Sequence, residues 1–199
     1  MDLQAKALDW TQNLPQGLDA DSLYDTFKVK AEALTVKVIR CVGPKEAAMA
    51  IAKEIKDNNF KKVVSAPLTR IDINVLKDQL EQTSVEFVTD LTRDVVEQAD
   101  LGISEFDLAI ADLGALVQDA ADLYKRLVST LPPTHLAVIS SKSLVKTFEE
   151  SLEVIQKTYG SDLPAFIAYV TGPSKTADIE RVLTIGVHGP GRLIVVCVD

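Results

Sequence analysis

The segment 171–191 gathers side chains that can bind a small anion and exchange a proton. Two glycine-proline pairs, Gly172-Pro173 and Gly189-Pro190, bracket it. Between them lie hydroxyl groups, a cation, carboxylates and one of the two histidines of the chain, at Ser174, Lys175, Thr176, Asp178, Glu180 and His188. The packing of an apolar core does not require this mixture, so the segment is the first candidate for a functional site.

The turn at Gly172-Pro173 predicts the end of a strand, and the residues after it have the pattern of a helix start. A helix N-terminus leaves backbone N–H groups unpaired and carries partial positive charge, which favours a bound carboxylate or phosphate. Lys175 would add its charge to such a site. The hydroxyls of Ser174 and Thr176 would either face the anion or only cap the helix.

Two residues of the segment are candidate catalytic groups. Asp178 and Glu180 would point about 200° apart on a helix, so they cannot act together on one ligand, and Asp178 is the better candidate. His188 lies in a tight turn beside Gly189, where its imidazole would exchange a proton near neutral pH or bond a backbone carbonyl. The other histidine, His135, begins an apolar strand and is predicted to be half-buried and structural.

A third candidate lies at Asp112-Leu113-Gly114. A carboxylate at the end of a strand fits the edge of an open α/β sheet, where ligands bind. An aspartate close to a glycine is equally typical of a hairpin turn. We expect Asp112 and Gly114 to line one pocket with the segment 172–178 and His188, or else to form only a turn between two strands.

Apolar, β-branched runs alternate with amphipathic segments from residue 35 onward. The runs predict strands at 35–42, 62–66, 85–88, 106–111, 112–117, 134–139, 164–170 and 193–198. The helical periodicity predicts helices at 45–58, 73–82, 94–99, 124–129 and 144–159. This alternation indicates one α/β domain at 35–199, with a mostly parallel sheet covered by helices on both faces. Residues 1–34 are expected to form a helical N-terminal arm, which docks on this domain or on a second subunit.

The composition limits the class of protein. The chain has 199 residues, of which 47% are hydrophobic and 25% charged, the balance of a folded globular protein. Its net charge of −8 argues against nucleic acid or an anionic membrane as a partner. The first residues lack the pattern of a signal peptide and no apolar run approaches the ~20 residues that span a bilayer, so a cytoplasmic location is expected.

Cysteine and histidine are too few for a closed metal site. Cys41 and Cys197 are the only cysteines, and both lie in apolar contexts typical of buried strands. No C-x-x-C spacing exists. The sequence therefore predicts that the chain itself holds no metal, iron–sulfur cluster or other cofactor.

Several stretches, in order, resemble the LUD-domain (lactate-utilisation) family. They are 101–104, 107–112, 131–138, 172–180 and 186–190. The resemblance implies the fold of the sugar-phosphate isomerase, CoA-transferase and formyltetrahydrofolate cyclo-ligase group. It also implies a role beside two iron–sulfur proteins in the oxidation of L-lactate to pyruvate.

Two positions depart from the pattern of the family. Lys175 stands where the family usually has arginine, and lysine binds an anion without the bidentate fork of a guanidinium group. Leu113 and Ala115 stand where the family tends to have hydroxyl-bearing residues on both sides of Gly114. Any ligand contact made by those hydroxyls is lost, so only backbone N–H groups near Gly114 would remain.

Three functions are compatible with these residues. The resemblance favours the subunit without iron–sulfur clusters in a lactate-oxidising complex, which would bind a small organic anion or its partner subunits. The second is a stand-alone enzyme of the CoA-transferase or cyclo-ligase type that binds a phosphate-bearing ligand, with Glu105 or Glu180 as candidate nucleophile. The third is an interaction module, with other partners or as a homodimer. The residues leave open whether the chain is itself an enzyme.

Overall fold

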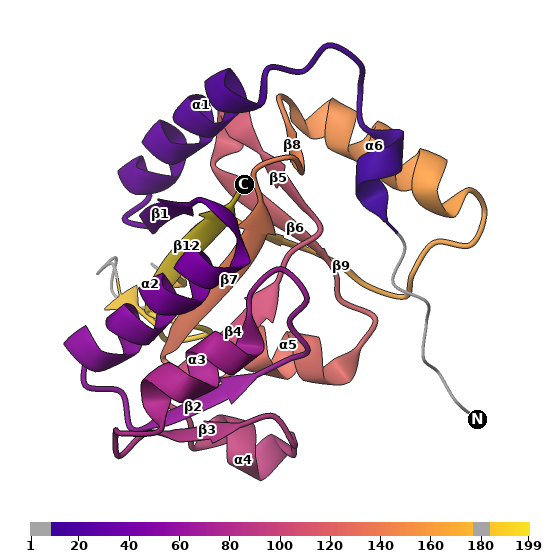
Figure 1. Cartoon of the computed structure of the whole chain (residues 1–199). Helices are drawn as coiled ribbons and strands as arrows, with labels where there is room; N and C mark the ends of the chain where they lie inside the picture. Colours follow the sequence, from indigo (N-terminus) through magenta and orange to yellow (C-terminus); the bar gives the residue numbers. More distant parts are fainter. Residues whose placement is uncertain (1–8, 177–183) are drawn as a thin grey trace.

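The centre of the molecule is a six-stranded sheet in which every neighbouring pair of strands is parallel (Figure 1). The computed structural model describes residues 9–176 and 184–199. The order across the sheet is β1-β12-β7-β4-β2-β3. The strands are β1 (Lys37–Cys41), β2 (Lys62–Ser65), β3 (Glu86–Val88), β4 (Leu101–Glu105), β7 (Thr134–Ser140) and β12 (Arg192–Val198). The predicted α/β class with a mostly parallel sheet is confirmed.

The sequence of β12 explains why it lies inside this sheet. Its side chains alternate between the two faces, as strand geometry requires, and both sets are apolar. One set packs into the core beneath one face and comprises Ile194, Val196 and Val198. The other set packs beneath the opposite face and comprises Leu193, Val195 and Cys197. A strand that is apolar on both sides is stable only between two covering layers.

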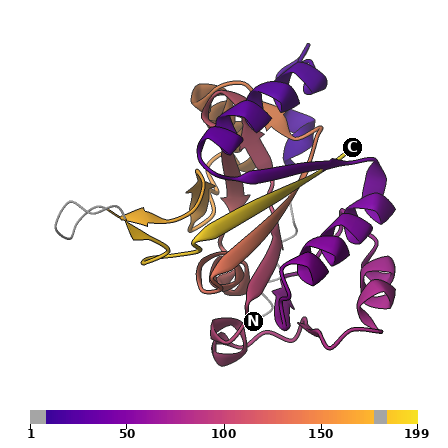
Figure 2. The ribbon, with the colours of Figure 1, turned by 90° about the vertical axis from the view of Figure 1, so that its left-hand side faces the viewer.

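Helices cover both faces of the sheet. α2 (Gly43–Asp57) and α3 (Ile73–Leu80) pack on one face and lie to the right of the sheet in Figure 2. The opposite face is covered by α1 (Ala20–Ala33) and by a second sheet. Near β2, α4 (Arg93–Glu97) and α5 (Leu123–Thr130) complete this second layer around the buried side chain of Val64.

The second sheet has four short strands in the order β8-β5-β6-β9. They are β5 (Leu108–Ile110), β6 (Ala115–Asp119), β8 (Leu144–Val145) and β9 (Ile167–Val170). β5 and β6 are antiparallel and are joined by the 3₁₀ turn η2 (Ala111–Leu113). They correspond to the two adjoining strands predicted at 106–111 and 112–117. The far face of this sheet is covered by α6 (Phe148–Tyr159) and by the 3₁₀ turn η1 (Trp10–Asn13).

The predicted helix at 144–159 begins later than its periodicity suggests. Its first two residues form β8, and the helix proper starts after Thr147, which forms a capping box with Glu150. The helix buries Ser151, Val154 and Ile155. Phe148 and Leu152 are 41% and 46% exposed, whereas Ile155 is buried.

The predicted N-terminal arm contains α1, and this helix packs directly on the domain. Asp19 caps it by accepting bonds from the N–H groups of Asp21 and Ser22. Its buried side chains Leu23, Tyr24, Phe27 and Ala31 belong to the same apolar cluster as residues of β7 and β12. The free energy of this burial favours a docked arm over an extended one.

The predicted helix after Gly172-Pro173 is wrong for the residues that the structure describes. Lys175–Thr176 form β10, which pairs antiparallel with β11 (Thr184–Ile185). A β-branched threonine at the pairing position favours this extended backbone over a helix start. The two strands form a hairpin that projects from the body of the molecule in Figure 2.

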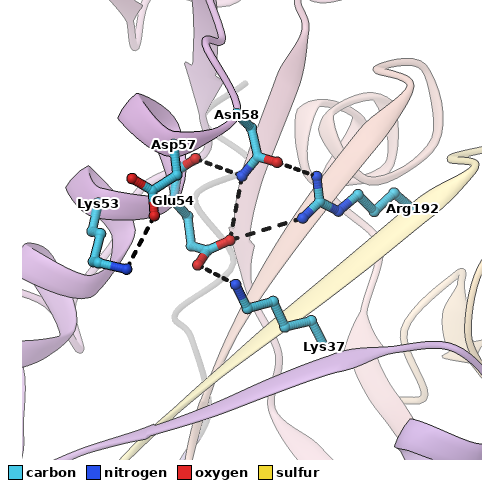
Figure 3. A network of polar contacts seen from close by, with 6 residues as sticks. All are labelled: Lys37, Lys53, Glu54, Asp57, Asn58 and Arg192. Carbon is cyan, nitrogen blue, oxygen red and sulfur yellow. Dashed lines mark hydrogen bonds and ion pairs between the residues drawn. The ribbon is translucent and has the colours of Figure 1, made fainter.

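A buried glutamate joins α2 to the amino ends of two strands (Figure 3). The side chain of Glu54 is 4% exposed, and its carboxylate lies 2.5 Å from Nζ of Lys37 in β1 and 3.9 Å from Arg192 in β12. Asn58 donates to the carbonyl oxygen of Glu54 at 2.8 Å and accepts from Arg192 at 2.5 Å. A buried carboxylate is tolerated only with such partners, so the network fixes α2 against this edge of the sheet.

Gly114 sits where a side chain would collide with α1. Its backbone is left-handed, with φ 61° and ψ 30°. A Cβ atom at this position would lie 2.5 Å from the backbone nitrogen of Ala31. The close approach of η2 to α1 therefore requires glycine for its conformation and for its size.

Replacing Gly114 with alanine tests this packing. Gly114→Ala should lower the free energy of unfolding by more than the ~1–3 kcal/mol that a left-handed non-glycine residue costs by itself, because the α1 backbone must also move. Urea unfolding measures the loss. Gly17→Ala is the control, since Gly17 has φ 76° but open space around it. Equal losses in the two variants would contradict the argument from close approach.

Candidate functional site

The structure brings together two loops of the predicted anion site. The N–H of Ser174 donates to the carbonyl oxygen of Pro190 at 2.8 Å, and the N–H of Gly186 donates to the carbonyl oxygen of Ser174 at 2.9 Å. A Cβ atom on Gly189 would lie 3.4 Å from that of Ser174. Ser174 and Gly189 are therefore neighbours. Asp178 lies outside the described residues.

Other predicted residues of this segment contact the end of α1. Gly172 has φ 100°, and a Cβ atom there would lie 3.3 Å from Cβ of Leu34. Pro173 is buried. Nζ of Lys175 donates to the carbonyl oxygen of Leu34 at 3.4 Å. These contacts hold the base of the hairpin against α1.

The remaining predicted residues lie in the hairpin segment and in the turn between β5 and β6, and both of these parts approach the C-terminal end of α1. Thr176 pairs with Thr184 in the hairpin, and His188 is exposed in the bend that follows it. Asp112 lies in η2, where its N–H donates to the carbonyl oxygen of Lys146 at 3.0 Å. Asp112 and Gly114 therefore belong to the turn between β5 and β6. Of the two interpretations of Asp112, the structure contains the turn between two strands, because η2 joins β5 and β6 of the second sheet.

A pocket of about 350 Å³ opens at the carboxyl ends of the parallel strands. Its lining residues come from the ends of four strands and from the N-terminal segment: Asp9, Thr11, Pro44, Arg70, Ser140, Lys142, Ser143, Val198 and Asp199. Ser140 and Val198 are the last residues of β7 and β12, and Pro44 lies in the first turn of α2 after β1. Ligands of open α/β sheets bind at this edge.

Two polar groups of the pocket have unused hydrogen-bonding capacity. Ser143 is fully buried, and its Oγ has no hydrogen-bond partner among residues 9–176 and 184–199. Lys142 donates its backbone N–H to Oγ of Ser140 at 3.2 Å, and no carboxylate of the described residues lies within 4.0 Å of its Nζ. A buried hydroxyl without a partner is costly, so this part of the pocket is suited to a small anion that accepts hydrogen bonds.

Glu105, the last residue of β4, anchors the loop that carries Arg70. Its carboxylate accepts bonds from the backbone N–H groups of Thr69 and Arg70, both at 2.6 Å. It also accepts from Oγ1 of Thr69 at 2.8 Å and from the guanidinium group of Arg70 at 2.9 Å. A carboxylate held by four donors is a poor nucleophile, so Glu105 acts here by positioning Arg70 at the mouth of the pocket.

The carboxylates that line the pocket are engaged with neighbours. Asp9 accepts bonds from the backbone and from Oγ1 of Thr11, at 3.0 and 2.6 Å. Asp199 accepts two bonds from Nε of Arg40, at 2.9 and 3.1 Å. Although partial burial raises the pKa of Asp199, its hydrogen bonds and the charges of Arg40 and Lys142 lower that pKa below its ordinary value. Both groups therefore remain ionised acceptors rather than proton donors at neutral pH.

A buried polar cluster lies between β4, β6 and β7. Nε2 of His135 lies 2.9 Å from Oγ of Ser104, and Gln118 donates to the carbonyl oxygen of Glu105 at 2.7 Å. His135 is 1% exposed, so it is more deeply buried than the half-buried position predicted for it. Burial lowers the pKa of His135 to about 3. The imidazole is therefore neutral in the folded protein.

The cysteines lie on opposite faces of the sheet, Cys41 with the α2 side and Cys197 with the α1 side. Burial raises the pKa of the Cys41 thiol to about 11 and that of Cys197 to about 12. Both thiols are therefore unreactive at neutral pH. Among residues 9–176 and 184–199, no cluster of three or more histidine, cysteine, aspartate and glutamate side chains is arranged to hold a metal ion.

Sequence patterns pointed to the hairpin segment and missed the polar residues of the pocket. Arg70 and the adjacent residues Lys142 and Ser143 lie outside any recognised motif, and Arg70 is far from the other two in the chain. The available signal was their position, because each follows a predicted strand of a parallel sheet. The carboxyl ends of parallel strands meet at one edge, which brings such residues together.

The fold has a counterpart among solved structures. The crystal structure of a DUF162 family protein from Deinococcus radiodurans superposes with a TM-score of 0.65, covering 92% of this chain and 99% of that chain at 21% identity. This similarity identifies the class of fold. Residues 24–198 match the model of the LUD domain, so the chain belongs to the LUD-domain family. The match begins inside the predicted N-terminal arm and includes most of α1.

Similar sequences are found among lactate utilization proteins. Lactate utilization protein C 1 of Bacillus mycoides is 39% identical over 103 residues, which cover 51% of this chain and 44% of that protein. Lactate utilization protein C of Bacillus subtilis is 36% identical over 105 residues, covering 52% and 44%. The same-named protein of Halalkalibacterium halodurans is 32% identical over 157 residues, covering 75% and 68%. The chain thus matches less than half the length of the first two relatives.

No helix in the described ranges combines the length and apolar character needed to cross a bilayer.

The buried imidazole predicts how stability depends on pH. The folded protein keeps His135 neutral, whereas the unfolded chain binds its proton with the ordinary pKa of about 6.5. Neutral His135 therefore contributes fully to the free energy of unfolding above pH 6.5, and this contribution is lost as the pH falls toward 3. The free energy of unfolding should fall by about 2 kcal/mol by pH 5. Urea unfolding of His135→Gln between pH 7.5 and 5 should lack this loss. His188→Gln, which removes the exposed histidine, should show the same loss as the wild type. An equal pH dependence in the wild type, His135→Gln and His188→Gln would contradict the argument.

Proposed function

We propose that this LUD-domain protein functions in lactate utilisation and that it binds a small organic carboxylate in the pocket at the carboxyl edge of its parallel sheet. The family membership and the names of its relatives support the first part. The second part is supported chiefly by one observation, the unpartnered hydroxyl of Ser143 in a pocket that also contains Lys142.

The chemistry of the pocket favours a carboxylate ligand. The ammonium group of Lys142 supplies charge, and the hydroxyl of Ser143 supplies a donor. Arg70 adds a second cation, held in place by Glu105. Because the protein carries a net charge of −8, an anion is attracted only where cations gather locally. The cations of this pocket are Lys142 and Arg70; the carboxylates Asp9 and Asp199 also line it but are engaged by Thr11 and Arg40, so we propose that the anion binds beside Lys142.

The roles of these residues are binding and orientation. Asp9 and Asp199 are engaged by their own hydrogen bonds, and the buried imidazole of His135 does not line the pocket. The engaged state of Glu105 argues against this residue as the carboxylate nucleophile of a CoA-transferase, and Glu180, the other candidate, lies outside the described residues. We therefore propose a ligand-binding subunit, in which any chemistry on the carboxylate is completed by partners.

The hairpin of β10 and β11 is the second candidate location for an anion. Ser174 and Gly189 adjoin there, Lys175 supplies a charge, and His188 follows on the exposed bend. The candidate residues Gly172, Pro173, Thr176 and Asp178 belong to the same segment. This alternative predicts that binding depends on Lys175 and His188 rather than on Lys142.

The partners that we propose are two iron–sulfur proteins of a lactate-oxidising complex, and the hairpin is the surface proposed to contact them. Its strand β11 and the bend after it expose two large apolar side chains, Ile185 at 54% and Val187 at 48%. Exposed apolar side chains on a projecting hairpin are typical of contact surfaces. A homodimer through the same surface is the competing arrangement.

Substitution of single lysines tests the location of the anion. Lys142→Ala should weaken binding of lactate or pyruvate about 10- to 100-fold, the loss expected for one charge-assisted hydrogen bond. Isothermal titration calorimetry at constant ionic strength measures the dissociation constants, with inorganic phosphate as the competing ligand. Lys175→Ala and His188→Ala should bind as the wild type does. Weakened binding in these two variants alone would move the site to the hairpin, and tighter binding of phosphate would favour the stand-alone enzyme.

Charged substitutions on the hairpin test the partner surface. Ile185→Asp and Val187→Asp should abolish co-purification of the tagged chain with the co-expressed iron–sulfur proteins, because a carboxylate cannot be buried without a partner. Val29→Asp is the control, since Val29 is also an exposed apolar residue, 67% exposed, but lies on α1. Co-purification that survives both hairpin substitutions would place the contact elsewhere, and a change of oligomeric mass in the isolated variants would indicate a homodimer.

A further inference from the structure

A second, smaller pocket adjoins the polar one and shares a residue with it. Its volume is about 290 Å³. Its lining is mainly apolar and comprises Leu14, Pro15, Gly17, Leu18, Ala20, Leu23, Ser141, Lys142 and Leu144. Lys142 lines both pockets. The side chain of lysine has an apolar stem and a charged end, so it suits the boundary between an apolar and a polar space.

One continuous segment, residues 9–23, forms a wall of both pockets. Asp9 and Thr11 line the polar pocket, and residues 14–23 line the apolar one. This segment crosses the molecule between α6 and the start of α1, as Figure 1 shows. We refer to residues 9–23 as the strap.

The strap is anchored at both ends. At its start, Trp10 is 2% exposed and donates from Nε1 to the hydroxyl of Tyr159 at 3.2 Å. Asn13 donates to Oγ1 of Thr158 at 3.1 Å. At its end, Leu23 is buried in the core beneath α1. The middle of the strap lies between these anchors, over the apolar pocket.

We propose that the ligand of this site is a monocarboxylate with an apolar substituent several carbons long. Its carboxylate would lie against Lys142 and Ser143, and its apolar part would extend beneath the strap between Leu18 and Leu144. This inference rests on the proposed function, because it names the class of carboxylate that the same site binds. It follows from the adjacency of a polar and an apolar pocket on the two sides of one lysine.

The proposal separates the preferred ligand from the smallest acids. Lactate and pyruvate carry a single methyl group, so they would occupy only the polar part and leave the apolar pocket unfilled. A longer acid removes its chain and the lining side chains from water together. Affinity should therefore rise with chain length until the apolar pocket is full.

A series of 2-hydroxy acids tests this expectation. Calorimetry with 2-hydroxypropanoate (lactate), 2-hydroxybutanoate, 2-hydroxyhexanoate and 2-hydroxyoctanoate should give about fourfold tighter binding for each added methylene, the factor that corresponds to burying one such group. Fluorescence of Trp10, the only tryptophan of the chain, gives a second measure of binding at the strap. The dependence on length should disappear in Ala20→Phe, because the larger side chain fills the apolar pocket and leaves the polar one unchanged.

Matched variants make each outcome decisive. Ala20→Ser is the control for a substitution at this half-buried position. Leu18→Asn is a second change in the lining of the apolar pocket, and it should also reduce the dependence of affinity on the chain length of the acid. Far-UV circular dichroism verifies that each variant is folded. Lys142→Ala should weaken binding of every acid in the series by a similar factor.

The possible results distinguish this inference from the function on which it rests. Affinities that are independent of chain length but fall in Lys142→Ala would overturn the inference and leave the proposed carboxylate site intact. A length dependence that persists in both Ala20→Phe and Leu18→Asn would also overturn the inference, since the chain would then lie elsewhere. Absence of Lys142-dependent binding for all acids would overturn both.

Discussion

The pairing of β12 with β1 and β7 is the constraint on which the rest of the structure depends. β1 has β12 as its only neighbour in the six-stranded sheet, so the edge strand joins the sheet only through the last strand of the chain. Because all pairs are parallel, their carboxyl ends lie along one edge. That edge receives Pro44 after β1, Ser140 at the end of β7 and Asp199 after β12, which together outline the polar pocket. A change of register between β12 and β7 would separate these residues.

Charged side chains are paired differently at the amino ends and at the carboxyl ends of the parallel strands, and this contrast favours the carboxyl ends as the binding site. At the amino edge, the buried carboxylate of Glu54 is matched by Lys37 and Arg192, so the charges are satisfied within the protein. At the carboxyl edge, Lys142 has no such partner among the described residues, and Ser143 retains an unused hydroxyl. The first arrangement holds elements together. In the second arrangement, the charge of Lys142 and the hydroxyl of Ser143 remain available to a ligand.

Gly114 and the strap link the packing of α1 to the shape of the proposed binding site. Gly114 allows η2 to approach α1, and α1 in turn fixes the end of the strap through Leu23. The other end of the strap depends on Trp10 and its contact with Tyr159. The strap is therefore part of the packed structure and at the same time a wall of both pockets. The packing of α1 and of Trp10, away from the ligand, therefore determines the shape of the two pockets.

The sequence by itself determined the α/β class and most of the elements, but it did not predict the central strand β4 or the strand β10. Continuous apolar runs such as 134–139 and 193–198, separated by helical segments, predicted a mostly parallel α/β sheet. A strand that is apolar on both faces must be covered by a layer on each side. Local patterns could not decide which residues meet, because that depends on strand order. The prediction that Asp112 and the hairpin segment line one pocket therefore rested on motifs alone; in the structure Asp112 lies in the turn between β5 and β6, and Lys175 lies in a β-hairpin instead of a helix. Only the tertiary structure brought Arg70 together with Lys142 and Ser143, because they follow β2 and β7, two strands that are distant in the chain and are separated by β4 alone in the sheet.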